Sequence, residues 1–185
     1  MGAGTGEFLA LAREFDWEPF GTELSAFARQ RAREKFGLEL LGVPAGELAS
    51  LGRTFDLVHL SHVFEHFTKP VEVLTALRAL TGPGSLLVIE VPNQWESLNH
   101  AVSKVRRLFR PVSRSVFSIH HPYFYSRDTL IALVEKHGFD VAQARTHIPE
   151  YYRFGLHRRI AGLASWLGDL MGGRGELIEV VAVRR

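Results

Sequence analysis

The chain has 185 residues, of which 46% are hydrophobic, 23% charged and 11% aromatic, and its formal net charge is +2. This length and composition predict one folded domain and exclude an intrinsically disordered chain, and no apolar run approaches the roughly 20 residues of a membrane span. The chain contains no cysteine, which excludes disulfides and thiolate chemistry and fits a cytoplasmic location.

Predicted helices and strands alternate along the first part of the chain. A glycine loop leads into a helix over residues 6–14, and a short strand over residues 17–22 follows it. Ser25 is predicted to cap a helix that Gly37 ends, and a second strand covers residues 38–43.

The same alternation continues in the middle of the chain. Residues 55–60 are a third predicted strand, and residues 71–80 form an amphipathic helix with apolar residues at three-residue steps. A turn over residues 81–84 leads into the strongest predicted strand, SLLVIEV at 85–91, whose nearly unbroken apolar run is typical of a strand buried on both faces.

The second half combines regular elements with two irregular inserts, over residues 93–125 and 148–172. Between them, Ser126 is predicted to cap a helix that ends near Gly138, and the strand after it covers residues 139–147. A closing strand is predicted over residues 176–184. Alternating helices and strands predict a doubly wound α/β sheet, which binds ligands at the carboxyl ends of its strands.

Charge is distributed unevenly along the chain. Residues 1–98 carry 8 Lys or Arg against 13 Asp or Glu, whereas residues 99–160 carry 11 against 4. The basic part contains five cations at near-helical spacing, namely Lys104, Arg106, Arg107, Arg110 and Arg114. Such a stripe could contact a nucleic acid, an anionic lipid surface or an anionic substrate. No aromatic residues are interleaved with the cations, so a solvated helix face is favoured over a nucleic-acid site.

Glycines at positions 2, 4 and 6 form a G-x-G-x-G loop before the first predicted helix. Without Cβ atoms, this backbone can approach a ligand closely. Glu23 lies 21 residues after Gly2, where a carboxylate can accept both hydroxyls of an adenosine ribose. Residue 7 is Glu where the dinucleotide fingerprint has its third glycine, and a carboxylate beside a pyrophosphate is unfavourable. The loop therefore predicts a nucleoside cofactor without phosphates in preference to NAD or FAD.

With these features the sequence resembles the class I S-adenosylmethionine-dependent methyltransferases, and in particular the small-molecule branch of the ubiquinone-biosynthesis O-methyltransferases. Six stretches carry the resemblance in the family's order: GAGTGEFL at 2–9, FGTELS at 20–25, VPAGELASL at 43–51, FDLVHLSHVFEHFTKP at 55–70, GPGSLLVIEVPN at 82–93 and HHPYFYSRDTLIALVEKHGFDV at 120–141. The resemblance implies a single domain over residues 1–185 with a Rossmann-like, doubly wound, mostly parallel sheet whose last strand is antiparallel.

The resemblance also implies that the glycine loop and the ends of the next strands bind S-adenosylmethionine. It assigns to the cofactor Gly2, Ala3, Gly4 and Gly6 at the methionine moiety, Glu23 at the ribose, Leu24, Gly46 and Glu47 at the adenine, and Ser61 and His62 along the pocket. Methyl transfer is an in-line displacement at an activated sulfonium, so the protein mainly positions the two reactants.

Members of the family have a strand before the glycine loop, which usually ends in an acidic residue and lies in the middle of the sheet. The given sequence begins in the loop, so this strand is expected either in an upstream segment or to be lost. Loss of a central strand would leave two rows of backbone groups without partners, which favours the upstream segment.

The stretch His62-x-x-Glu65-His66 follows the third predicted strand. It matches the H-x-x-E-H pattern of some zinc proteases, but that motif needs both histidines on one helix, and here Pro70 soon follows. Some relatives carry E-x-x-E-H at this place, which helps them to bind a divalent metal near the acceptor. Because His62 replaces the first Glu, a divalent metal is not favoured, and His66 is interpreted as a hydrogen-bonded wall of the pocket or as a catalytic group.

His120 and His121 precede the aromatic run Pro122–Tyr125. A histidine with a pKa near neutrality is a candidate general base, so His66, His120 and His121 are the predicted catalytic residues. The family commonly has histidine at this place, where it can equally be a structural contact that closes the site.

The two inserts, over residues 93–125 and 148–172, are predicted to cap the acceptor site. The second carries aromatic and aliphatic residues at helical spacing, which could line a substrate pocket or contact a membrane surface, although simple packing is favoured.

The sequence thus predicts a methyltransferase for a small-molecule acceptor, with an oxygen nucleophile marginally preferred. The basic insert favours an anionic acceptor, and no nucleic-acid partner is favoured. Two alternatives stay open, a non-catalytic remnant that binds a partner and a nucleotide-dependent oxidoreductase.

Overall fold

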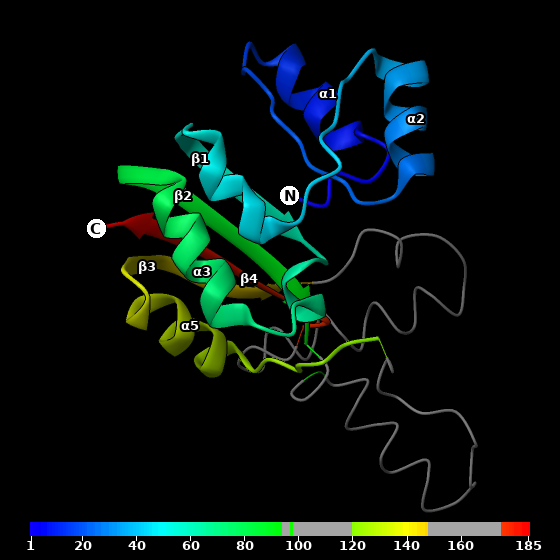
Figure 1. The fold of residues 1–185 in the computed structure, drawn as a ribbon. Coiled ribbons are helices and arrows are strands. Elements are labelled where there is room, and N and C mark those ends of the chain that lie inside the picture. Colours follow the sequence, from blue (N-terminus) through cyan, green and yellow to red (C-terminus); the bar gives the residue numbers. More distant parts are fainter. Residues whose placement is uncertain (94–96, 98–119, 148–174) are drawn as a thin grey trace, which may run out of the picture.

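A computed structural model describes residues 1–93, 97, 120–147 and 175–185, and all statements about the structure concern these residues. The helices are α1 (Glu7–Glu14), α2 (Ala26–Phe36), α3 (Pro70–Ala79) and α5 (Arg127–Lys136), with the 3-10 helices η1 (Ala45–Leu51) and η2 (Phe64–His66). The strands are β1 (Phe55–Ser61), β2 (Thr81–Pro92), β3 (Phe139–His147) and β4 (Leu177–Arg184). Figure 1 shows α1 and α2 lying together beside the sheet.

The four strands form one sheet in the order β1-β2-β4-β3. β1 and β2 are parallel, and β4 is antiparallel to both of its neighbours, β2 and β3. The strands β1, β2 and β3 therefore run in one direction and only the last strand in the chain runs against them. This arrangement confirms the predicted α/β sheet with an antiparallel last strand.

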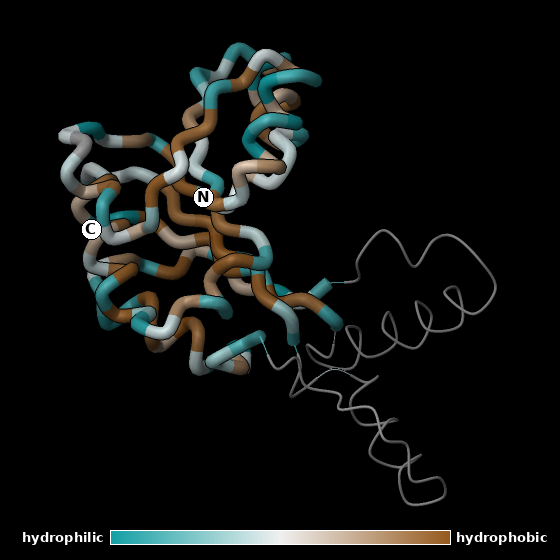
Figure 2. The backbone as a smooth tube through the Cα atoms, turned by 45° about the vertical axis from the view of Figure 1, so that its right-hand side comes forward, coloured by the Kyte–Doolittle hydropathy of each residue, from teal (hydrophilic) through white to brown (hydrophobic). Residues whose placement is uncertain are grey.

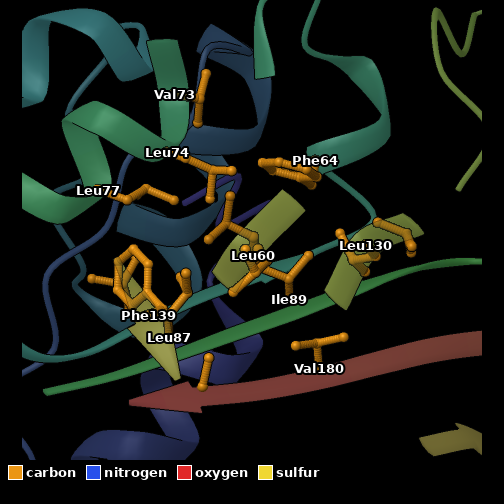
Figure 3. Packing of buried hydrophobic residues seen from close by; sticks show 14 of the residues in the cluster. Leu60, Phe64, Val73, Leu74, Leu77, Leu87, Ile89, Leu130, Phe139 and Val180 are labelled. Carbon is orange, nitrogen blue, oxygen red and sulfur yellow. The ribbon is translucent and has the colours of Figure 1, made fainter. Parts of the chain in front are cut away.

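One face of the sheet is covered by α3 and α5 and holds the core (Figure 1). Alternate residues of each strand point to this face. Leu60 of β1 and Ile89 of β2 are therefore completely buried, whereas the residues directly before and after each of them in its own strand are only half-buried. Figure 2 shows hydrophobic positions gathered along the strands, and Figure 3 shows Leu74 of α3 and Leu130 of α5 meeting them. The apolar alternation of the strands thus sets where the helices dock.

The predicted helix ends are confirmed. The Ser25 hydroxyl accepts a hydrogen bond from the Ala28 amide at 3.2 Å, and α2 ends at Gly37, whose φ of 65° is the left-handed conformation that closes a helix. In the same way, the hydroxyl of Ser126 accepts from the amide of Thr129 at 3.2 Å at the start of α5. Local side-chain chemistry fixes these boundaries.

The predicted strands over residues 17–22 and 38–43 are wrong as strands. The two segments are joined by an isolated parallel bridge between Thr22 and Leu41. A strand requires a ladder of such pairs that continues over several residues, so these segments are not strands. Residues 1–3 lie between this bridge and β1: the Met1 amino group donates to the His59 carbonyl at 2.8 Å, and the Ala3 amide donates to the Thr22 carbonyl at 2.9 Å. The expectation of a strand before the loop concerns residues outside the given sequence and stays a prediction.

The predicted turn over residues 81–84 is also corrected, since these residues belong to β2. Thr81 already pairs with Phe55, but the next pair joins Leu57 to Leu86, so the chain of β2 bulges between the two pairs. Gly84, with a φ of 85°, lies in this bulge.

Most of the two predicted inserts lies outside the described residues, and so do the basic stripe over residues 104–114 and the aromatic cluster of the second insert. Of the first insert, the structure describes residues 93, 97 and 120–125. None of the helices in the described ranges has the length and apolar character that crossing a membrane requires.

Candidate functional site

The glycine loop adopts a backbone that only glycine accommodates without strain. Gly2, Gly4 and Gly6 have φ values of 64°, 54° and 88°. A Cβ atom on Gly2 would overlap the side chain of Val63, and one on Gly6 would lie 3.0 Å from the side chain of Leu38. The loop is therefore pressed against the segment that follows β1.

Glu23 is held inside this loop. Its Oε2 accepts a hydrogen bond from the Gly4 amide at 3.0 Å, and its Oε1 accepts from the Ser25 amide at 2.9 Å. A carboxylate has about four lone-pair positions, so two of them remain for the hydroxyls of a ribose. The predicted proximity of the acidic residue and the loop is thus observed, and the pair fits a nucleoside.

The residues assigned to the adenine are exposed. Leu24 is 67% exposed, and Gly46 and Glu47 are exposed at the start of η1. Leu48, in the same 3-10 helix, lines a hollow of about 60 Å³ together with Met1 and other residues of β1 and its surroundings. This hollow brings η1 close to the start of the loop.

Ser61 and His62 lie where β1 ends. The Ser61 hydroxyl donates to Oε1 of Glu90 at 2.7 Å, and the His62 amide donates to the Glu90 carbonyl at 3.0 Å. His62 has a φ of 53°, which is uncommon for a residue with a side chain and occurs more often at functional sites. Val63, the next residue, contacts Gly2, so these predicted pocket residues adjoin the glycine loop.

Glu90 was missed as a site residue. Besides Ser61, its carboxylate contacts Nε2 of His147 on β3 at 2.9 Å and lies 3.8 Å from Nε2 of His62. Across the sheet Glu90 pairs with Glu179 of β4, which Arg145 neutralises at 2.7 Å. The signal was present in the sequence, because Glu90 is the only charged residue in the apolar run SLLVIEV.

The three predicted catalytic histidines do come together. The Nδ1 atom of His66 lies 3.1 Å from the His120 carbonyl, and the rings of His66 and His121 meet edge to face with centroids 4.7 Å apart. These contacts join η2 to a segment 54 residues further along the chain. They are consistent both with a catalytic role and with the alternative of a hydrogen-bonded pocket wall.

Glu65 lies beneath these histidines and was not predicted as a site residue. The residue is 2% exposed, and neither carboxylate oxygen has a hydrogen-bond partner in the described part of the chain. The Nδ1 atom of His62 is 3.7 Å from Oε1, which is too long for a good hydrogen bond. Glu65 was noted in the sequence only as a member of the H-x-x-E-H stretch, and its burial is what the spacing of that stretch did not indicate.

The carboxylates set the protonation of the neighbouring histidines. Glu65 raises the pKa of His62, and burial opposes it. Burial lowers the pKa of His121, against an opposite effect of Glu65. The imidazole of His62 therefore carries a proton more readily than that of His121, which favours His121 as the neutral partner.

The glycine loop and the histidine cluster adjoin one another at the carboxyl ends of β1 and β2. His62 joins them, because it follows β1 beside the loop and its two ring nitrogens face Glu65 and Glu90. In doubly wound sheets, ligands bind at this edge of the sheet. One group of residues fits a nucleoside cofactor, and the other offers imidazole and carboxylate groups to a second ligand.

A family model described as a methyltransferase domain matches residues 1–144. The chain therefore belongs to this methyltransferase domain family. The match decides against the nucleotide-dependent oxidoreductase, whereas the ubiquinone-biosynthesis branch stays a prediction. No curated protein sequence gives a significant match.

Several solved structures with the same fold are described as methyltransferases that use S-adenosylmethionine. A SAM-dependent methyltransferase from Archaeoglobus fulgidus has 22% sequence identity and a TM-score of 0.68, covering 99% of this chain and 83% of that one. A possible histamine N-methyltransferase from Thermotoga maritima has 18% identity and a TM-score of 0.68, covering 100% and 80%. Magnesium protoporphyrin IX methyltransferase from Synechocystis PCC 6803, solved with S-adenosylhomocysteine, has 15% identity and a TM-score of 0.63, covering 100% and 71%. The fold is thus that of S-adenosylmethionine-dependent methyltransferases.

Proposed function

We propose that this chain binds S-adenosylmethionine at the glycine loop and transfers its methyl group to a small molecule, through an oxygen nucleophile. The observation that carries the proposal is the hydrogen bond of 3.0 Å from the Gly4 amide to Glu23, which holds a carboxylate with spare acceptor capacity against a loop whose three glycines all have positive φ values.

The residues of the loop would bind and orient the cofactor. Glu23 would hold the ribose hydroxyls, the backbone of residues 2–6 would surround the methionine moiety, and Gly46 and Glu47 would lie beside the adenine. When bound, the cofactor supplies a methyl group on an activated sulfonium. Ser61 and His62 would close the pocket at the end of β1, where Glu90 fixes the Ser61 hydroxyl.

The histidine cluster would form the acceptor side. As the acceptor oxygen forms its bond to the methyl carbon, the bond from that carbon to sulfur breaks, and the proton of the acceptor hydroxyl must leave. An imidazole can take this proton, which supports His66, His120 and His121 as the groups that handle it.

An anionic acceptor is proposed from the basic stripe in the first insert. Its charges would lie near the acceptor if the insert caps the site, and they would then lower the KM for a phosphate- or carboxylate-bearing substrate. Reversing the charges of Arg106, Arg107 and Arg110 is expected to raise that KM with little effect on cofactor binding. An unchanged KM would remove this part of the proposal.

A methyl-transfer assay tests the function directly. The chain is incubated with S-adenosylmethionine and pairs of small acceptors, each pair consisting of a free hydroxyl compound and its methyl ether, with a matching amine series. Release of S-adenosylhomocysteine that depends on the free hydroxyl is the expected result. Release with amines alone would contradict the oxygen nucleophile. If the cofactor binds tightly but no acceptor of either series is methylated, the alternative of a non-catalytic binding protein is favoured.

A further inference from the structure

We propose that a basic hollow at the amino end of β3 binds a small molecule through its phosphate groups. The hollow has a volume of about 350 Å³ and is lined by Thr75, Arg78, Lys136, His137, Gly138 and Arg185. This volume is at the lower end of the range of ligand pockets, which is roughly 300–1,000 Å³. The inference concerns a second site, so it can be tested apart from the proposed methyl transfer.

The basic hollow lies at the edge of the sheet opposite to the candidate functional site. β1, β2 and β3 run in the same direction, and the candidate site is at the carboxyl ends of β1 and β2. Gly138 directly precedes β3, whose first residue, Phe139, pairs with Arg184 at the end of β4. The basic hollow is therefore beside the C-terminus marked in Figure 1, and neither the glycine loop nor the histidine cluster contributes to its lining.

Positive charge dominates the lining of the basic hollow. Three of the six lining residues are Lys or Arg, and none of the six is acidic. Nε of Arg185 donates to Asp140 at 2.7 Å, so the charge of this arginine is compensated. Arg78 and Lys136 have no acidic partner among the residues that the structure describes. Phosphate groups suit such a pair, because arginine binds them through two parallel hydrogen bonds and lysine binds them as a point charge.

Gly138 allows the guanidinium group of Arg78 to lie against the backbone. This glycine has a φ of 92°, and a Cβ atom at its position would lie 2.8 Å from Nε of Arg78. The ring of His137 is also fixed, because its Nδ1 atom lies 2.6 Å from the Leu133 carbonyl. Part of the lining is therefore arranged before a ligand binds, which reduces the entropy that binding costs.

Arg184 adds positive charge next to the basic hollow. Its Nη1 donates to the carbonyl of Gly138 at 3.4 Å and to that of Arg185. Its Nε is buried and has no hydrogen-bond partner in the described part of the chain. Burial lowers the pKa of Arg184, and the charge of Arg78 lowers it further, so the two guanidinium groups repel each other. An anion in the hollow would offset this repulsion.

A purely structural role of the same cations makes a different prediction. Arg78 and Lys136 lie in the last turns of α3 and α5, where a cation interacts favourably with the helix dipole. That interaction concerns each helix separately and does not require both helix ends to line one hollow. It predicts that loss of either cation changes stability by the same amount with and without an anion, whereas a binding site predicts that the stabilisation by the anion is lost.

The experiment is a calorimetric titration of the chain with inorganic diphosphate at constant ionic strength, together with thermal melting in diphosphate and in NaCl. Four variants are compared with the unaltered chain: Arg78→Gln, Arg78→Lys, Lys136→Gln and Arg31→Gln. Arg31 is the matched control, because it is an exposed cation of α2 that pairs with Glu34 and does not line the hollow. Circular dichroism shows whether each variant is folded, and a short single-stranded oligonucleotide is titrated in parallel.

We expect the unaltered chain to bind one diphosphate and to melt at a higher temperature in diphosphate than in NaCl. Arg78→Gln should weaken binding about tenfold, since hydrogen bonds to charged groups have effects of that size, and Arg78→Lys should weaken it less because the charge remains. Lys136→Gln should also weaken binding, and Arg31→Gln should not.

Four results would overturn the inference. The unaltered chain may bind no diphosphate, folded Arg78→Gln may bind it unchanged, or Arg31→Gln may weaken binding as much as Arg78→Gln does. The fourth is an oligonucleotide that binds more tightly than diphosphate and loses its binding in Arg78→Gln, which would assign the hollow to a nucleic acid.

Discussion

Two carboxylates at the candidate site, those of Glu23 and Glu65, differ in the hydrogen-bond donors that the described residues offer to them. Glu23 accepts hydrogen bonds from the amides of Gly4 and Ser25, so its charge is compensated by backbone dipoles. Glu65 is more deeply buried and has no such donor in the described part of the chain. The first therefore keeps acceptor positions for a ligand with hydroxyl groups, whereas the second faces the imidazole of His62 at 3.7 Å.

At the same scale, His62 should make stability depend on pH. Its pKa is raised by Glu65, so its protonated form stabilises the folded chain below the unfolded pKa of about 6.5, and this contribution is lost as the pH rises through the folded pKa. We expect His62→Gln to lower the unfolding free energy more at about pH 5.5 than at about pH 8.5.

Urea unfolding of the metal-free chain and of His62→Gln at both pH values measures this difference. His59, whose pKa is lowered by burial, acts in the opposite direction, but it is present in both proteins and its contribution cancels in the comparison. His121 also has a lowered pKa, and because His62 contributes to that lowering, the effect of His121 cancels only in part. An equal difference at the two pH values would show that Glu65 does not interact with His62 in the folded state.

At the scale of elements, the helices could be predicted from the sequence and two of the strands could not. Ser25, Gly37 and Ser126 determine helix ends through contacts within a few residues, and such signals can be found in the sequence alone. A strand depends on a neighbouring chain, so the apolar residues around Thr22 and Leu41 did not suffice to make strands of their segments.

The cap of α5 provides a test at this scale. Ser126→Ala removes the acceptor for the Thr129 amide and is expected to lower the unfolding free energy by about 0.5–2 kcal/mol. Ser126→Asp restores an oxygen at the same position and should recover most of the loss. Chemical denaturation measures both variants, and an unchanged stability of Ser126→Ala would mean that the cap does not hold this helix.

The site itself was predictable in part. The glycine loop, Glu23 and the three histidines follow from motifs that name residue types at fixed spacing, and the structure does bring them together. Glu65 matters through its burial without a hydrogen-bond partner among the described residues, and Glu90 matters through its contact with His147 on another strand. Neither burial nor cross-strand contact can be derived from spacing along a single chain.

At the scale of the whole molecule, one core connects the sheet to α3 and α5. Leu60 is completely buried at its centre, and Leu60→Ala is expected to lower the unfolding free energy by about 2–5 kcal/mol through lost transfer energy and a residual cavity. Leu24→Ala is the matched control, because Leu24 is 67% exposed and its truncation should change stability by less than about 0.5 kcal/mol. Equal effects in thermal melts of the two variants would contradict this core.

The same core holds the carboxyl ends of β1 and β2 in place, so the glycine loop and the histidine cluster depend on a common scaffold. Substitutions in the core should therefore weaken ligand binding only as far as they unfold the chain, whereas substitutions in the loop should weaken binding in a folded protein.

Calorimetric titration with S-adenosylhomocysteine tests the central claim most directly. The account predicts binding of one molecule per chain, at least about tenfold weaker in Glu23→Ala, since one tenfold step corresponds to about 1.4 kcal/mol and a charged acceptor of hydroxyl hydrogen bonds contributes that much. Glu39→Ala, at an exposed carboxylate that pairs with Arg33, should bind as the unaltered chain does. No binding by the folded chain, or equally tight binding by Glu23→Ala, would contradict the account.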